Sequence, residues 1–164
     1  MVPAEDEAGG DRAREAFEKG LAALRRRERG TAELADWLRR RGFEPAEVSS
    51  ALARLTEVGE LDDRRFATRF AEDKRELRGW GPERIREALA ARGIPHELVE
   101  LALSADGHAH QLERAEALLA ERGKALGSEA DRARALSYLT RRGYDYELAY
   151  EAVRRFGQEG RRAA

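Results

Sequence analysis

The sequence predicts an all-α protein built from three tandem three-helix modules that form an elongated, slightly curved helical array. Three observations predict it: apolar residues recur at helical spacing, glycines end the periodic segments, and one helix–Gly–helix pattern occurs three times. Of the 164 residues, 41% are hydrophobic and 38% are charged. So high a charged share suits small modules, which have much surface for each unit of core.

The apolar residues follow helical spacing from Asp11 onward, as Leu21 with Leu24 and Leu34 with Leu38 illustrate. Glycine follows nearly every periodic segment, at a position where the backbone turns left-handed and any Cβ would clash. These glycines are Gly30, Gly42, Gly59, Gly79, Gly93, Gly123, Gly143 and Gly157. The pattern predicts nine helices, near residues 12–29, 32–41, 45–58, 63–78, 82–92, 95–105, 108–122, 129–142 and 146–156.

Residues typical of helix starts precede most of these segments. Proline suits the first helical position, where its missing N–H costs little, and Asp or Ser suits the N-cap. The prolines are Pro45, Pro82 and Pro95, and the predicted N-caps are Asp62, Ser128 and Asp145. Ser128 with Asp131 also matches a capping box, in which each residue bonds to the backbone N–H of the other.

The repeat lies in residues 33–52, 84–103 and 134–153, which align on Gly42, Gly93 and Gly143 at spacings of 51 and 50 residues. Each of these glycines is preceded by a leucine at four residues. It is directly followed by an apolar residue, and an alanine stands nine residues after the glycine. These positions are Leu38, Leu89 and Leu139; Phe43, Ile94 and Tyr144; and Ala51, Ala102 and Ala152. One further helix precedes each pair. We therefore predict modules at 12–59, 60–106 and 107–157, between a disordered acidic tail at 1–11 and a flexible tail at 158–164.

The residue types argue against an enzyme, a metal site or a cofactor. The chain has no Cys, and its three histidines, His96, His108 and His110, form no pattern of metal ligands. The adjacent acids Asp62 and Asp63 are better explained as helix caps than as a catalytic pair. No 18-residue apolar run predicts a membrane helix, and the acidic N-terminus does not resemble a signal peptide. Together with the lack of Cys, this fits the cytoplasm.

Net charge is −1, but its distribution is uneven. Residues 12–92 hold 20 Lys or Arg against 16 Asp or Glu. Basic clusters stand at Arg25–Arg27 and Arg39–Arg41, at helix ends. Either they interact with the helix dipole as solvated charges, or they contact phosphates or acidic protein surfaces.

Trp80 has two interpretations as well, since Lys74, Arg75, Arg78 and Arg84 surround it in sequence. The indole either fills the joint between two helices or anchors a partner among these cations. Trp37 follows Leu34 by three residues and is predicted to be core.

Residues 61–103 resemble the central module of the RecX family. The residues that carry the likeness are Leu61, Asp62, Asp63, Phe66, Ala67, Gly81, Ile85, Leu89, Gly93 and Ile94. The stretches before and after are similar to the family's first and third modules, so the resemblance covers roughly residues 12–156. It implies a bacterial cytoplasmic regulator with no reaction of its own. Such a regulator binds RecA–DNA filaments and restrains filament growth, ATP hydrolysis, strand exchange and co-protease activity.

We expect the filament to be contacted by an exposed basic surface in the first two modules of a monomer. Its residues are Arg39, Arg40, Arg41, Lys74, Arg75, Arg78, Trp80 and Arg84. The alternative is a direct DNA-binding protein that uses its Gly turns as helix-turn-helix units. Against it, the helices after the turns carry acids such as Glu47, Glu97 and Glu147, which phosphate would repel. Only weak, non-specific DNA contact is therefore expected.

Overall fold

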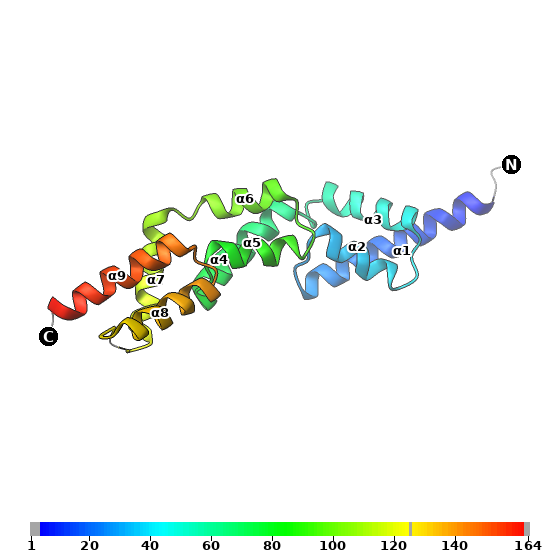
Figure 1. The fold of residues 1–164 in the computed structure, drawn as a ribbon. Coiled ribbons are helices and arrows are strands. Elements are labelled where there is room, and N and C mark those ends of the chain that lie inside the picture. The colour runs from blue at the N-terminus through cyan, green and yellow to red at the C-terminus, as the bar shows by residue number, and fades with distance from the viewer. Residues whose placement is uncertain (1–3, 125, 163–164) are drawn as a thin grey trace. The chain divides into compact units, whose positions relative to one another are not determined.

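The computed structural model describes residues 4–124 and 126–162, and across these it has nine helices and no strand, as predicted (Figure 1). The helices are α1 (Ala4–Arg26), α2 (Thr31–Arg39), α3 (Pro45–Glu57), α4 (Asp63–Arg78), α5 (Pro82–Ala90), α6 (His96–Ser104), α7 (His108–Glu121), α8 (Glu129–Arg141) and α9 (Tyr146–Arg162). Both predicted ends of α4 agree with the structure, and most other ends lie within two residues of their predicted positions.

The two outer helices differ most from the prediction, since α1 starts earlier and ends at Arg26, before the predicted residue 29, and α9 ends later. Helix α1 begins at Ala4, within the segment for which disorder was predicted, and α9 continues to Arg162 through the predicted flexible tail. Ala and Glu favour the helical backbone, and the segment before Asp11 contains both, which accounts for the earlier start. The rest of each predicted tail, residues 1–3 and 163–164, lies outside the described residues.

The predicted caps are confirmed. Asp62 accepts from the backbone N–H of Arg65 at 2.9 Å, and Asp145 from that of Leu148 at 2.9 Å. Ser128 and Asp131 form the predicted capping box at the start of α8. Pro45 and Pro82 begin α3 and α5, while Pro95 immediately precedes α6.

Six of the eight predicted turn glycines have positive φ: Gly42, Gly59, Gly79, Gly93, Gly123 and Gly143. The prediction is wrong for the other two. Gly157 lies inside α9, which passes through it. Gly30 has extended backbone, with φ −76° and ψ 165°, and is the N-cap of α2 rather than the end of α1.

By contact density the chain divides into two compact units. The first comprises residues 1–67 and 90–98, and the second comprises residues 68–89 and 99–164. The core of the first unit gathers around Leu34, Leu38 and Leu55, where α1, α2 and α3 meet. The core of α7, α8 and α9 in the second unit gathers around Leu139 and Leu148.

The repeat positions are buried as the alignment requires. Leu38, Leu89 and Leu139 are each 0% exposed, and the apolar residues after the glycines and the aligned alanines are buried as well. Sequence periodicity therefore identified equivalent core sites in all three repeats.

One contact recurs in both units, and we call it the repeat junction: the start of the first helix of one repeat, α2 or α5, meets the Gly turn of the next repeat. In the first unit, a Cβ added to Gly93 would lie 2.7 Å from Cβ of Ala32. A Cβ added to Gly30 would lie 2.7 Å from Cδ1 of Ile94. The carboxylate of Asp63 caps α2 here, since its Oδ1 accepts from the backbone N–H of Thr31 at 2.7 Å.

The junction of the second unit is joined by backbone hydrogen bonds. Gly81 N–H donates to the carbonyl of Arg142 at 2.8 Å, and Glu83 N–H donates to that of Gly143 at 3.0 Å. A Cβ on Gly81 would lie 2.4 Å from the carbonyl carbon of Gly143, and one on Gly143 would lie 2.4 Å from Cβ of Arg84. Real atoms do not approach so closely, so glycine is required on both sides.

The second unit also contains a buried ion cluster. Arg75 and Asp106 are each 8% exposed, and Nε of Arg75 lies 3.3 Å from Oδ2 of Asp106. Arg75 also donates from Nη2 to the carbonyl of Ala102 at 2.9 Å, and Arg114 donates to Oδ2 of Asp106 at 2.6 Å. Burial lowers the pKa of Arg75, and the charge of Asp106 partly offsets that effect. Arg75 thus holds the end of α6 against α4.

Replacing Leu89 with Ala should lower the free energy of unfolding by roughly 2–5 kcal/mol, because the side chain is fully packed. Urea titration followed by circular dichroism measures the loss. Leu77→Ala is the control, since Leu77 is 75% exposed. A loss below about 0.5 kcal/mol for Leu89→Ala would contradict the alignment of the repeats.

Replacing Arg75 with Ala should destabilise the protein by roughly 3–5 kcal/mol, because the carboxylate of Asp106 loses its buried partner and keeps only the half-buried Arg114. Arg78→Ala, at an exposed position on the same helix, should change stability by less than about 0.5 kcal/mol. Thermal melts of the two variants side by side make the comparison. Equal melting temperatures would show that the cluster adds nothing to stability.

Candidate functional site

The second unit has a wide groove where the end of α4, the segment that leads into α5, and parts of α7 and α8 come together. Its volume is about 920 Å³. The lining residues are Arg75, Glu76, Leu77, Arg78, Gly79, Trp80, Arg84, Arg114, Ala117, Leu118, Glu121, Tyr138, Arg141 and Arg142. The repeat junction at Gly81 and Gly143 determines where these helices meet, because it holds the turn after α8 against the start of α5. Four of the predicted partner-binding residues, Arg75, Arg78, Trp80 and Arg84, thus line one groove.

Two aromatic rings in the groove are covered by cations. Cζ of Arg84 lies 4.3 Å from the centre of the Trp80 ring, and Nζ of Lys74 lies 5.2 Å from it. Cζ of Arg142 lies 4.8 Å from the centre of the Tyr138 ring. A guanidinium over an aromatic face is attracted by the ring quadrupole and keeps donors free for a further partner. Trp80 is half-buried, so the indole both fills a joint and lines an open surface.

Arg75 was expected to be exposed, and this expectation is wrong. The guanidinium lies in the buried cluster with Asp106, because the end of α6 closes over that part of α4. A charge reversal at Arg75 would place two carboxylates together in the interior and would unfold the unit rather than probe its surface. The exposed cations of the groove are instead Arg78, Arg84 and Arg141.

The sequence prediction named none of the lining residues of α7 and α8, among them Tyr138, Arg141 and Arg142 near the end of α8. Arg142 donates from Nη1 to the carbonyl of Arg78, at the end of α4. The two residues are 64 positions apart in the sequence. The alignment of Gly93 with Gly143 offered a signal, since it gives the third repeat the same turn as the second. No local pattern, however, indicates which helix start that turn contacts.

The predicted triplet Arg39–Arg41 belongs to the first unit and is exposed. Arg39 pairs with Asp36 at 2.8 Å, and Cζ of Arg41 lies 3.4 Å from the centre of the Trp37 ring. Trp37 is half-buried against the core, which agrees in part with its prediction as a core residue. Arg40 lines a shallow cleft beside Gly93, at the repeat junction of this unit.

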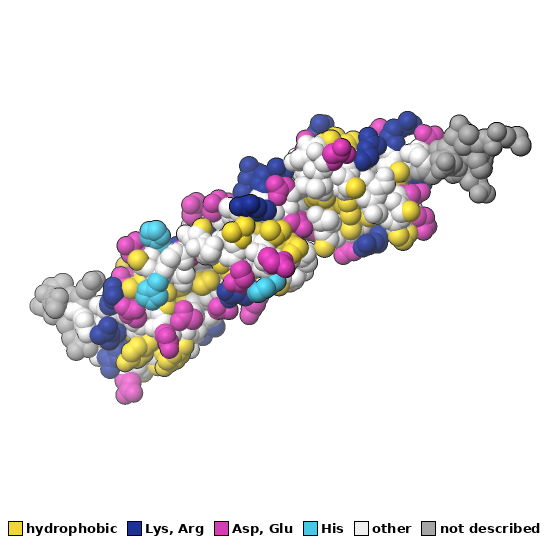
Figure 2. Space-filling model, turned by 90° about the horizontal axis from the view of Figure 1, so that it is seen from above, with side chains coloured by type: hydrophobic (Ala, Val, Ile, Leu, Met, Phe, Trp, Pro, Cys, Tyr) yellow, Lys and Arg dark blue, Asp and Glu magenta, His cyan; other side chains and the backbone are white. Residues whose placement is uncertain are grey.

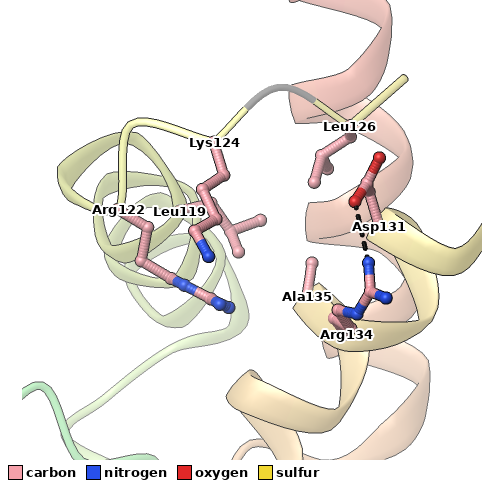
Figure 3. Close-up of a pocket in the computed structure, with 7 residues that line it drawn as sticks. All are labelled: Leu119, Arg122, Lys124, Leu126, Asp131, Arg134 and Ala135. Atoms are coloured by element: carbon pink, nitrogen blue, oxygen red, sulfur yellow. Dashed lines mark hydrogen bonds and ion pairs between the residues drawn. The ribbon is translucent and has the colours of Figure 1, made fainter. Parts of the chain in front are cut away.

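A smaller cavity of about 130 Å³ lies between the end of α7 and the start of α8 (Figure 3). Arg122, Lys124 and Arg134 stand around it, and Arg134 is paired with Asp131 at 3.1 Å. Pockets that bind small molecules usually measure about 300–1,000 Å³, so this cavity is too small for one.

Charges of both signs are interspersed on the face shown in Figure 2, so no broad single-sign field covers that face. Within the described residues, His, Cys, Asp and Glu nowhere gather in a group of three that would hold a metal ion. None of the helices in this part of the chain is long and apolar enough to cross a lipid bilayer. Asp62 caps α4, as predicted, whereas Asp63 caps the start of α2 in another repeat.

Two family models match the chain. Residues 16–55 match the first three-helix domain of RecX, and residues 62–103 match the second. These ranges fall within the first two modules predicted from the repeat.

Curated relatives and solved structures agree with these matches. A protein named regulatory protein RecX from Thermus thermophilus is 37% identical over 146 residues, which are 89% of this chain and 95% of the relative. One of the same name from Pseudomonas fluorescens is 37% identical over 126 residues, 76% of this chain and 81% of the relative. The crystal structure of RecX from Lactobacillus salivarius has a similar fold, with a TM-score of 0.82 at 20% identity, over 90% of this chain and 97% of that one. The chain therefore belongs to the RecX family, whose members are non-enzymatic regulators that modulate the RecA recombinase.

Proposed function

We propose that this protein binds RecA–DNA filaments as a monomer in the bacterial cytoplasm, through the groove around Trp80. Binding there restrains filament growth and lowers ATP hydrolysis, strand exchange and co-protease activity. The observation that carries the proposal is the set of exposed arginines, Arg78, Arg84 and Arg141, beside a half-buried indole. Such a groove suits a polyanionic filament, because the arginines attract it at long range and the aromatic rings supply contact area.

The shape and the lining of the groove favour a partner of macromolecular size. It is open, and its lining mixes arginines with the acids Glu76 and Glu121 and the exposed Leu77. Aromatic and Arg side chains dominate the binding energy of protein interfaces, while rim charges mainly set specificity and association rate. Lys74 belongs to the same surface through its contact with Trp80. Arg39, Arg40 and Arg41 offer a second basic patch on the first unit.

Reversing Arg78, Arg84 and Arg141 to Glu should weaken inhibition of RecA's ATPase roughly tenfold or more, because several exposed charges of about 0.2–1 kcal/mol each act together. Thermal melting should change little, since all three side chains are exposed. A matched control reverses Arg14, Arg26 and Arg154, which are exposed outside the groove.

A second variant reverses Arg39, Arg40 and Arg41 to Glu. It measures how much the first unit contributes to inhibition of RecA's ATPase. If this variant loses inhibition while the groove variant inhibits normally, the filament is contacted through the first unit and the groove has another role. If the control reversal abolishes inhibition as fully as the groove variant, the effect comes from net charge and the proposed site is wrong.

Direct recognition of a DNA site is the second candidate, and two features disfavour it. The Gly turns of the second and third repeats pack against helix starts at the repeat junctions, where an approaching duplex would have to displace them. Glu47 and Glu147 stand in the first turns of the helices that would enter the major groove. Phosphates would repel both carboxylates.

Binding to free DNA should therefore be weak and independent of sequence. The excess of four positive charges in residues 12–92 neutralises only a few phosphates, so log affinity should fall against log salt with a slope no steeper than about −4. Fluorescence anisotropy across a salt series measures this slope. A tight complex with one defined duplex at physiological salt would favour the helix-turn-helix interpretation.

A further inference from the structure

The Gly turn of the first repeat, Arg41–Gly42–Phe43, differs in its surroundings from the two equivalent turns. Gly93 and Gly143 are each packed against a helix start, and a Cβ on either would clash at 2.7 Å and 2.4 Å. Gly42 has φ +83°, like the others, but a Cβ there would meet nothing within 4 Å. The same structural element is thus covered twice and open once among the described residues.

The carbonyl of Gly42 nevertheless has a donor. Nη2 of Arg12, on α1, donates to it at 2.9 Å, and Cζ of Arg12 lies 4.7 Å from the centre of the Phe43 ring. In the second unit the corresponding carbonyl, that of Gly143, accepts instead from the backbone N–H of Glu83 at the start of a helix. A guanidinium and a helix N-terminus are alike in kind: both present N–H donors that carry positive charge. Arg12 therefore satisfies the carbonyl that a helix start satisfies at the junction of the second unit, while the space beside Gly42 stays open.

Arg12 is an easily displaced occupant. Its side chain is 44% exposed, and its ion pair with Glu15, at 3.2 Å, lies at the surface, whereas its second partner, Glu47 at 3.4 Å, is half-buried. Surface ion pairs of this kind contribute little, about 0–1 kcal/mol. A helix that arrives with its own N–H groups would replace one hydrogen bond with equivalent ones and release a long side chain into solvent.

The two junctions also indicate the chemistry of the missing helix. In both, the helix carries Gly at its start, Gly30 or Gly81, and a carboxylate in its first turn, Glu33 or Glu83. The open turn is preceded by the exposed Arg39, Arg40 and Arg41, which would attract such a carboxylate.

We propose that the turn at Gly42 is a docking site for the N-terminal end of a partner helix with glycine at its start and an acid in its first turn, held in the free protein by Arg12. The proposal rests on the proposed function, in that the helix belongs to a RecA protomer of the filament. It adds a contact of defined geometry in the first unit to the electrostatic groove of the second.

Replacing Gly42 with Asn tests the geometry directly. Asn tolerates positive φ better than most residues, and the free protein has open space for the side chain, so folding should be little affected. In a docked complex the same side chain would meet the first turn of the partner helix, as an added Cβ would meet Arg84 at Gly143 and Cβ of Ala32 at Gly93. Affinity for RecA filaments on single-stranded DNA should fall at least tenfold. Gly59→Asn is the matched control, because Gly59 has φ +75° and equally open surroundings in the same unit.

The outcomes separate this proposal from the proposed function. If the wild-type protein binds no filament, the proposed function fails and this contact fails with it. If the wild-type protein binds and Gly42→Asn binds equally well, only the docking site is wrong. If both Asn variants lose affinity, the loss reflects backbone strain and the docking site is likewise overturned. Sedimentation at high concentration tests a second copy as occupant: self-association that Gly42→Asn abolishes would replace RecA as the partner.

Arg12→Ala tests whether the partner helix displaces Arg12 from the carbonyl of Gly42. Removing the displaced side chain should raise filament affinity severalfold, whereas Arg14→Ala, on the exposed face of the same helix, should leave it unchanged. A fall in affinity for Arg12→Ala as large as that for Gly42→Asn would mean that Arg12 itself contacts the filament. The proposal that a partner helix displaces Arg12 would then be wrong.

Discussion

The close approach of backbone to backbone at the repeat junction is the constraint on which the rest of the structure depends. A helix start has N–H groups without partners inside the helix, and a turn has carbonyls without partners. The N–H groups can donate to these carbonyls only if the two segments of backbone come very near. Gly81 and Gly143 allow that approach in the second unit, whereas in the first unit Gly30 and Gly93 leave room for the side chains of Ile94 and Ala32. The groove around Trp80 exists because the junction brings Arg142 to the end of α4.

Much of the fold could be predicted because the signals are local. Each of these signals acts within a few residues. They are a glycine that must adopt a left-handed conformation, a leucine one turn before that glycine, and a capping side chain three residues before the backbone N–H that it accepts from. Leu89 and Ser128 were correctly assigned for this reason. Gly30 was not, because its role depends on Asp63 and Ile94, which approach from another repeat.

The candidate site was only half predictable for the same physical reason. Trp80 and Arg84 lie close together in sequence and share a ring contact. The burial of Arg75 depends on Asp106, and the place of Arg141 in the groove depends on how the third repeat meets the second. Charge patterning cannot distinguish a guanidinium that will be enclosed from one that stays in water, since both look the same along a basic helix. Buried ion pairs are weak evidence of net stability, but removing one partner is costly, which makes Arg75 a fixed point of the second unit.

The loop between α7 and α8 contrasts with the junctions. Added Cβ atoms at Gly123 and Gly127 would meet nothing within 4 Å, and α8 carries its own capping box, so its start needs no neighbouring repeat. Extra residues there would cost mainly the slowly growing entropy of closing a longer loop. Length variation among natural homologues and an engineered tag for a fluorophore should both be tolerated in this loop, whereas a single inserted residue between Gly79 and Gly81 would break the register that joins two repeats.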